Sequence, residues 1–114
     1  MSETTKQQSF GALVKVVIRF EPARRAELER ALQQFVPNIE LAFGWTNLGC
    51  RFEVGQPLCF IEWGLGSADE IVKVSEFEAR PDHPAWYLGM QPLVAGERID
   101  LVEGEKTTRL MDTL

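Results

Sequence analysis

The pattern that most constrains the fold is a strand, a turn and a helix start in residues 61–70, Ile-Glu-Trp-Gly-Leu-Gly-Ser-Ala-Asp-Glu. An apolar run with Trp63 near its end predicts a strand, and the two glycines that follow predict a turn. Ser67, with Glu70 three residues later, forms the capping-box pattern that begins a helix at about Ala68.

Prolines interrupt that helix within residues 80–84, Arg-Pro-Asp-His-Pro. Each proline lacks a backbone N–H and biases the residue before it away from helical angles. A second short helical piece is therefore expected from Pro84 to about Leu93. This order of parts constrains the fold, whereas no complete catalytic constellation is present to define a reaction.

Residues 10–20 alternate in character and predict the first strand. One face of this strand is apolar, and the other mixes apolar and basic side chains. The apolar face holds Ala12, Val14, Val16, Ile18 and Phe20, and the mixed face holds Leu13, Lys15, Val17 and Arg19.

A helix is expected from about Pro22 to Phe35, because proline suits a first helical turn and apolar residues then recur at helical spacing. Pro37 is expected to lie beyond its end. Residues 39–43 alternate again and predict a second strand, whose glycine-rich end at residues 44–49 is expected to be irregular.

The second half of the sheet is predicted from shorter patterns. Residues 50–54 and 58–63 flank Gly55-Gln56-Pro57 and predict a hairpin. Residues 99–102 predict the last strand. Residues 104–114 are polar and are interpreted as a tail or as an arm that crosses to a partner.

The predicted order is β-α-β-β-α-β, a ferredoxin-like split arrangement of the α+β class in which two helices cover one face of an antiparallel sheet. A single domain is expected to span residues 1–114, with its core at about 10–103. The other sheet face stays uncovered. Such a face predicts a homodimer, in which two sheets face each other as a dimeric α+β barrel.

Composition excludes several classes of partner. The chain has 17 acidic and 12 basic residues, a formal net charge of −5, which repels nucleic acid and anionic membranes. The first ten residues lack the apolar core of a secretory signal, and no apolar run reaches a membrane-spanning length. We therefore expect a cytoplasmic protein with no nucleic-acid or membrane partner.

The potential metal and redox ligands are few. The spacing of Cys50 and Cys59 matches no metal or redox motif, so two reduced core thiols are preferred over a disulfide. One histidine and two cysteines are too few for a dedicated metal cage. The chain also has no P-loop, no dinucleotide-binding glycine motif and no Ser/His/Asp order, so no metal, flavin or nicotinamide cofactor is expected.

Two segments resemble the antibiotic biosynthesis monooxygenase family of dimeric α+β barrels. Residues 60–63, Phe-Ile-Glu-Trp, resemble the family's strand with a Glu-x-Trp type ending, and Ser-Ala-Asp-Glu at 67–70 opens the helix. Residues 77–86, Phe-Glu-Ala-Arg-Pro-Asp-His-Pro-Ala-Trp, resemble the family's Phe-x-Ala-His segment with a second His a few residues later. The order of elements agrees over roughly residues 10–103.

The resemblance implies the fold and suggests a chemistry. Family members without a cofactor oxidise polycyclic phenols with molecular oxygen, and related members bind and degrade haem. Two features depart from the family: Arg80 replaces the first helical His, and residues 38–49 lack the usual Pro-Gly-Cys stretch. Haem-degrading relatives use an Asn in the first strand, and the first strand here has none.

Three residues are candidates for catalysis. Histidine is the side-chain type whose unperturbed pKa lies near neutrality, so His83 could accept a proton or bind haem, although it could equally cap backbone carbonyls at the helix break. Tyr87 could donate a hydrogen bond to a phenolate or quinone oxygen, or be satisfied in the core. Arg19 could pair with an acidic ligand or form a structural ion pair.

Four residues are candidates for substrate binding. Trp63 could stack on a flat substrate in the barrel interior or simply fill the core. Trp86 and Tyr87 are adjacent, so they point about a hundred degrees apart on a helix and one of them is expected to pack. Trp45 and Asn47 could form a pocket rim, and turn formation would also explain Asn47.

Two hypotheses follow. In the first, a homodimer binds a flat or hydrophobic small molecule and, by resemblance, oxygenates it without a cofactor. His83 would be the base, Trp63 and Trp86 the walls, and Tyr87 or Arg19 the oxyanion partner. In the second, the same side chains fill the interior of a non-catalytic ligand-binding or assembly domain.

Overall fold

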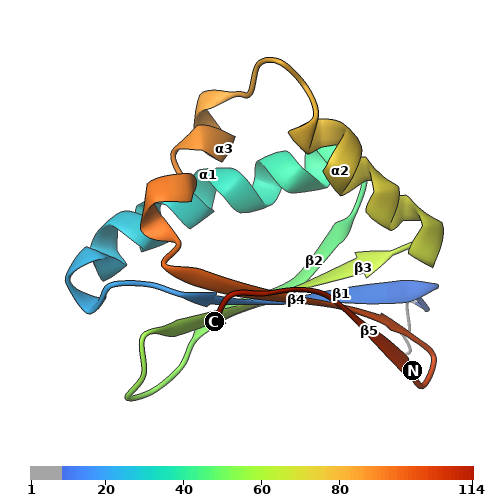
Figure 1. Cartoon of the computed structure of the whole chain (residues 1–114), viewed down its shortest axis with the longest axis horizontal. Helices are drawn as coiled ribbons and strands as arrows, with labels where there is room; N and C mark the ends of the chain where they lie inside the picture. Colours follow the sequence, from blue (N-terminus) through green and yellow to red (C-terminus); the bar gives the residue numbers. More distant parts are fainter. Residues whose placement is uncertain (1–8) are drawn as a thin grey trace, which may run out of the picture.

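In residues 9–114, five antiparallel strands form one sheet, and all the helices of this part of the chain cover one side of it (Figure 1). This computed structural model describes residues 9–114. The sheet order is β2-β3-β1-β4-β5, which is the ferredoxin-like α+β arrangement with one added edge strand. The strands are β1 (Ala12–Arg19), β2 (Thr46–Phe52), β3 (Leu58–Leu65), β4 (Gly96–Glu103) and β5 (Lys106–Asp112). The helices are α1 (Arg25–Phe43), α2 (Val72–Glu78) and α3 (Ala85–Leu88), with 3-10 turns at Pro22–Arg24, Ala68–Ile71 and Gln91–Leu93.

The predicted alternation of β1 is confirmed. β1 is the central strand and pairs with β3 on one side and β4 on the other. Ala12, Val14 and Ile18 are each 3% exposed and face the helices, where the core lies. The mixed face of β1, which carries Lys15 and Arg19, is the side that no helix covers.

The predicted end of the first helix and the predicted strand at residues 39–43 are both wrong. α1 continues through Pro37 to Phe43. Ile39 and Phe43 are buried one helical turn apart, whereas Leu41 is 84% exposed, which is a helical pattern rather than a strand pattern. Pro37 lies on the exposed side of α1, where a carbonyl that loses its partner can bond to water. Gly44 ends the helix in a left-handed conformation, with φ of 73°.

The second strand therefore begins later than predicted. β2 starts at Thr46 and forms the predicted hairpin with β3 around Gly55, which has a φ of 82°. The register of β2 shifts between Asn47 and Gly49. The glycine-rich stretch that was expected to end a strand is thus the bulged beginning of one.

The helix after β3 begins at Ala68 as predicted, but as a 3-10 turn without the predicted capping box. The Ser67 side chain makes no cap hydrogen bond. The Glu70 carboxylate instead accepts hydrogen bonds from Trp45 Nε1 at 3.2 Å and Lys73 Nζ at 3.1 Å. The predicted break at residues 80–84 is confirmed, since α2 ends at Glu78 and α3 begins at Ala85.

The interpretation of residues 104–114 as a tail or arm is wrong for most of that segment. Residues 106–112 form β5, which turns at Gly104 and pairs with β4 at the edge of the sheet. Ion pairs across the two strands stabilise this polar strand: Arg109 Nε lies 2.9 Å from Asp100 Oδ1, and Arg98 Nη2 lies 3.3 Å from Asp112 Oδ2.

Candidate functional site

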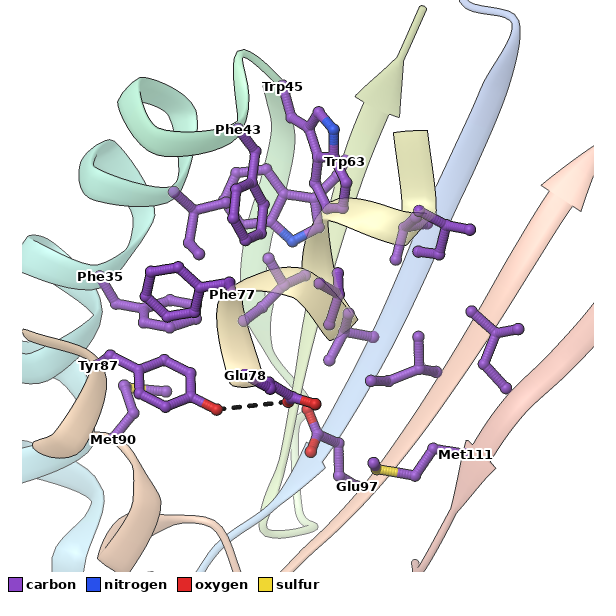
Figure 2. A pocket seen from close by; sticks show the side chains of 18 of the residues that line it. Phe35, Phe43, Trp45, Trp63, Phe77, Glu78, Tyr87, Met90, Glu97 and Met111 are labelled. Carbon is purple, nitrogen blue, oxygen red and sulfur yellow. Dashed lines mark hydrogen bonds between the residues drawn. The ribbon is translucent and has the colours of Figure 1, made fainter. Parts of the chain in front are cut away.

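A cavity of about 840 Å³ lies between the helices and the sheet, within a single chain (Figure 2). Its floor is the helix-facing side of β1, β3 and β4, and its roof comes from α1, α2 and α3. Leu110 and Met111 of β5 line one side. The sequence placed a binding site inside a barrel between two sheets, whereas this cavity needs no second chain.

The burial of β1 shows that the helices do not cover the sheet completely. Val16 occupies the middle of the central strand and is only partly buried, although its neighbours on the same face, Val14 and Ile18, are buried. Ile99, the partner of Val16 on β4, is also only partly buried. Well-packed cores leave few voids larger than a water molecule, so this exposure marks a cavity rather than ordinary packing.

Aromatic rings form one wall of the cavity. The Trp45 and Trp63 ring centroids are 6.4 Å apart, Phe43 lies 4.9 Å from Trp45, and Phe77 lies 5.6 Å from Phe43. The hydrogen bond from Trp45 Nε1 to Glu70 fixes the indole orientation. This wall can contact a flat molecule through ring faces and edges.

Acidic and phenolic groups gather at the other end, where Figure 2 shows Glu78, Glu97 and Tyr87 converging. The Tyr87 hydroxyl donates a hydrogen bond to Glu78 Oε2 at 3.3 Å. Burial, together with the charge of Glu78, raises the pKa of Tyr87. Burial also raises the pKa of Glu97, and the Glu78 charge raises it further.

Three of the predicted site residues line this cavity: Trp45, Trp63 and Tyr87. Trp86 packs behind them, stacked on Phe77 with centroids 5.7 Å apart. The expectation that only one of the adjacent pair Trp86 and Tyr87 faces the site agrees with this placement.

His83 is not among the lining residues. Its Nε2 lies 3.1 Å from the Phe77 carbonyl oxygen and donates to it, since a carbonyl can only accept. The imidazole packs against the Tyr87 ring, with centroids 4.9 Å apart. His83 therefore supports the cavity wall from behind, and its Nε2–H is bonded to the Phe77 carbonyl.

Arg19 and Asn47 also lie outside the cavity lining. Arg19 is on the uncovered sheet side and donates to the Ala95 carbonyl at 3.3 Å. The Asn47 backbone N–H donates to Glu40 Oε2 at 2.8 Å, and its side-chain amide donates to the Glu62 carbonyl at 3.3 Å. These bonds hold the bulged start of β2 in place.

Glu78 and Glu97 line the cavity but were not among the residues predicted from the sequence. A signal existed for Glu97, because it alternates with Ile99 and Leu101 and so puts a carboxylate on the apolar face of the last strand. Nothing in the sequence distinguished Glu78 from the neighbouring acidic residues of its helix.

The two cysteines form a second pair of reactive groups, outside the cavity lining, on the β2–β3 hairpin. Both are free, with their Sγ atoms 3.9 Å apart; Cys59 is buried and Cys50 is exposed. A hydrogen bond from Cys59 lowers the pKa of Cys50 to about 7. The same bond, together with burial, raises the pKa of Cys59.

Within residues 9–114, no group of three or more His, Cys, Asp and Glu side chains is placed to hold a metal ion. In the same part of the chain, no helix is both long and apolar enough to cross a membrane.

Comparison with known proteins identifies structural relatives only. No protein-family profile matches the chain, and no curated protein matches its sequence. A NIPSNAP family protein from Agrobacterium tumefaciens has a similar structure, with a TM-score of 0.65 and 13% identity, covering 80% of this chain and 90% of that one. A second protein from that organism has a TM-score of 0.66 and 14% identity, and the match covers 88% of this chain and 99% of that one. An uncharacterized NIPSNAP-like domain protein from Burkholderia xenovorans has a TM-score of 0.63 and 13% identity, and the match covers 93% of this chain and 97% of that one.

These neighbours confirm the ferredoxin-like α+β fold. Identities of 13% and 14% support the fold alone, because one fold hosts many unrelated functions. The resemblance to the antibiotic biosynthesis monooxygenases is matched at the level of this shared fold and not at the level of the family.

Proposed function

We propose that this protein binds a flat, largely apolar small molecule in the cavity between its helices and its sheet. The observation that carries the proposal is the partly exposed Val16 at the centre of an otherwise buried strand face, above which a cavity of about 840 Å³ opens. Small-molecule sites generally measure about 300–1,000 Å³ and combine apolar walls with a few polar groups. The aromatic wall of Trp45, Trp63 and Phe77 supports a flat ligand.

The alternative, a domain whose interior is simply core, is less consistent with this geometry. A structural core would bury Val16 and Ile99 as fully as Val14 and Ile18, whereas both are only partly buried. It would also place apolar groups where Glu97 lies on the sheet face.

Binding can be tested by titrating the neutral fluorescent probe N-phenyl-1-naphthylamine into the protein. Val16→Trp should fill the centre of the cavity and weaken probe binding at least about tenfold, the scale expected when a buried apolar contact is replaced by a clash. Val54→Trp is the matched control, because Val54 is 94% exposed and does not line the cavity. Equal binding by the two variants would refute the proposal.

Cofactor-independent oxygenation is the finer proposal, supported by the family resemblance and by the carboxylates that line the cavity. Such chemistry needs a base that faces the substrate and surroundings that exclude water. Glu78 is exposed in the unliganded protein, so the bound substrate itself has to exclude water there. Glu78 lines the cavity and accepts the Tyr87 hydrogen bond, so we propose Glu78 as the base in place of His83.

Oxygen uptake with an anthrone as substrate tests this step. An anthrone CH₂ would become a carbonyl, with one O₂ consumed and one water formed. Glu78→Gln should abolish turnover while His83→Ala retains it. Loss of turnover in folded His83→Ala alone would return the role of base to His83, and no uptake by the unaltered protein would remove the oxygenase proposal while leaving ligand binding intact.

A further inference from the structure

The charge of the cavity restricts the class of ligand that it can take. The polar side chains that line it are Glu78, Glu97, Tyr87, Gln91 and Ser75. No Lys, Arg or His of the described residues lines it. An anionic ligand would therefore meet two carboxylates and no counter-charge, which is a strong basis for rejecting it.

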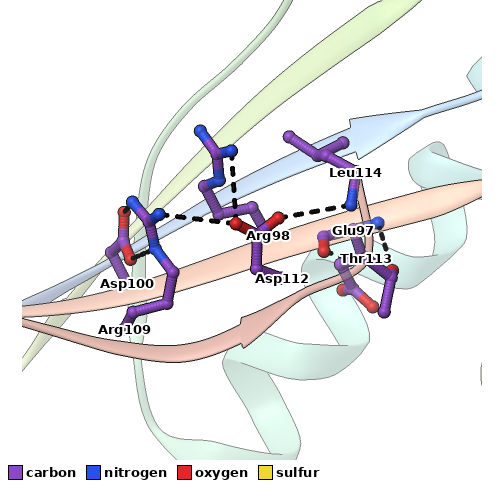
Figure 3. Close-up of polar contacts among 7 residues, drawn as sticks. All are labelled: Glu97, Arg98, Asp100, Arg109, Asp112, Thr113 and Leu114. Carbon is purple, nitrogen blue, oxygen red and sulfur yellow. Dashed lines mark hydrogen bonds and ion pairs between the residues drawn. The ribbon is translucent and has the colours of Figure 1, made fainter.

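The two carboxylates also differ from the other acidic groups near the end of the sheet. Asp100 and Asp112 are paired with Arg109 and Arg98 (Figure 3). Within residues 9–114, no Lys or Arg nitrogen lies within 4.0 Å of the Glu78 or Glu97 carboxylate. In Figure 3, Glu97 contacts Thr113 through its backbone, which leaves the carboxylate available to the cavity.

The surroundings of Glu97 make a cationic partner favourable. On β1, its cross-strand partner is Ile18, and Met111 of β5 lines the cavity beside it. The titratable groups that face Glu97 are Glu78 from α2 and Tyr87 from α3. A carboxylate among apolar groups and beside a second carboxylate is destabilised until a positive charge neutralises it.

We propose that the ligand is a flat apolar amine, with its rings against the aromatic wall and its ammonium group at Glu97 and Glu78. This inference rests on the proposed binding function and names its ligand class. The two ends of the cavity match the two ends of such a molecule, since the Trp45 and Trp63 rings bury its apolar part and the carboxylates accept hydrogen bonds from its N–H groups. The Tyr87 ring lies beside the acidic end and can make a cation–π interaction with the ammonium group.

Three naphthalene probes of one shape and different charge test this inference: 2-naphthylmethylamine, 2-naphthylmethanol and 2-naphthoate. The amine should bind about tenfold more tightly than the alcohol, the factor expected for a hydrogen bond to a charged group. The naphthoate should bind most weakly. Amine affinity should rise with pH above about 4.3, because burial raises the pKa of Glu97 from this ordinary value and Glu97 must lose its proton to pair with the ammonium group. Alcohol affinity should stay constant.

Charge-removing variants assign the preference to the carboxylates. Glu97→Gln and Glu78→Gln should each reduce amine affinity and leave alcohol affinity within about twofold. Glu76→Gln should change neither, because Glu76 lies on the same helix as Glu78 but does not line the cavity. Circular dichroism should show that all three variants remain folded. Equal binding of amine and alcohol, or tightest binding of naphthoate, would overturn the ligand class while cavity binding stands. Failure of all three probes, together with no effect of Val16→Trp on N-phenyl-1-naphthylamine, would refute the proposed function itself.

Discussion

The substitution Val16→Phe measures directly whether the space above the central strand is empty. The larger side chain adds about four carbons, and each buried CH₂ contributes about 0.8 kcal/mol, which sets an upper limit of about 3 kcal/mol. Val16 is only partly buried and a fixed ring loses rotamer freedom, so a gain of about 1 kcal/mol in the free energy of unfolding is expected. If the site were solidly packed, overpacking would instead cost about 1–3 kcal/mol. The sign of the change therefore decides between a cavity and a core.

Urea unfolding followed by tryptophan fluorescence gives this sign. With an m value of about 2 kcal/mol/M, the expected gain raises the midpoint by about 0.5 M. Leu28→Phe is the control, because Leu28 is 0% exposed and does not line the cavity, and it should lower stability by about 1–3 kcal/mol. A loss in Val16→Phe as large as that in Leu28→Phe would refute the cavity.

Three further predictions concern groups with distinct environments. Because the pKa of Cys50 is lowered to about 7, its alkylation by iodoacetamide should increase steeply between pH 6 and pH 8 while Cys59 reacts only after unfolding; mass spectrometry of the two peptides measures both, and equal labelling would contradict the geometry. The raised pKa of Glu97 means that the folded state binds its proton more tightly than the unfolded chain, so stability is lost as the pH rises above about 4.3. The urea midpoint of Glu97→Gln, relative to that of the unaltered protein, should therefore increase from pH 4 to pH 7, and a difference that does not change with pH would contradict this. Sedimentation equilibrium should show a dimer that becomes monomeric in Val17→Asp, since Val17 lies opposite Phe60 on the uncovered sheet side, and a monomeric unaltered protein would remove the predicted interface.

The sequence predicted those parts of the fold whose signals are local. The alternation in β1 and the prolines at residues 80–84 each act within one element, and both predictions are confirmed. The segment 39–43 misled because its apolar residues fit a period of two as well as a helical turn, and Pro37 favoured the strand. Only the packing of Ile39 and Phe43 against the sheet separates the two patterns.

β5 could not be predicted from its own residues, because its stability depends on another strand. Arg109 pairs with Asp100 of β4, and Arg98 of β4 pairs with Asp112. Read alone, these charges resemble a solvated tail. The candidate site shows the same limit. Aromatic residues such as Trp45, Trp63 and Tyr87 can be selected from the sequence, and the alternation of β4 marks Glu97, whereas Glu78 becomes a candidate only when α2 is placed over the cavity.

The proline break that is visible in the sequence also accounts for the position of the cavity. Pro81 and Pro84 separate α2 from α3 and both helices are short, so the helical layer leaves Val16 of β1 and Ile99 of β4 only partly buried. The part of the helix-facing sheet surface that lines the cavity does not require an apolar side chain at every position, and this allows Glu97 to occur beside Ile99. A longer helix over this part of the sheet would add core stability, but it would fill the cavity and require an apolar residue in place of Glu97. In this fold, the residues that limit the core are therefore the same ones that make a binding site possible.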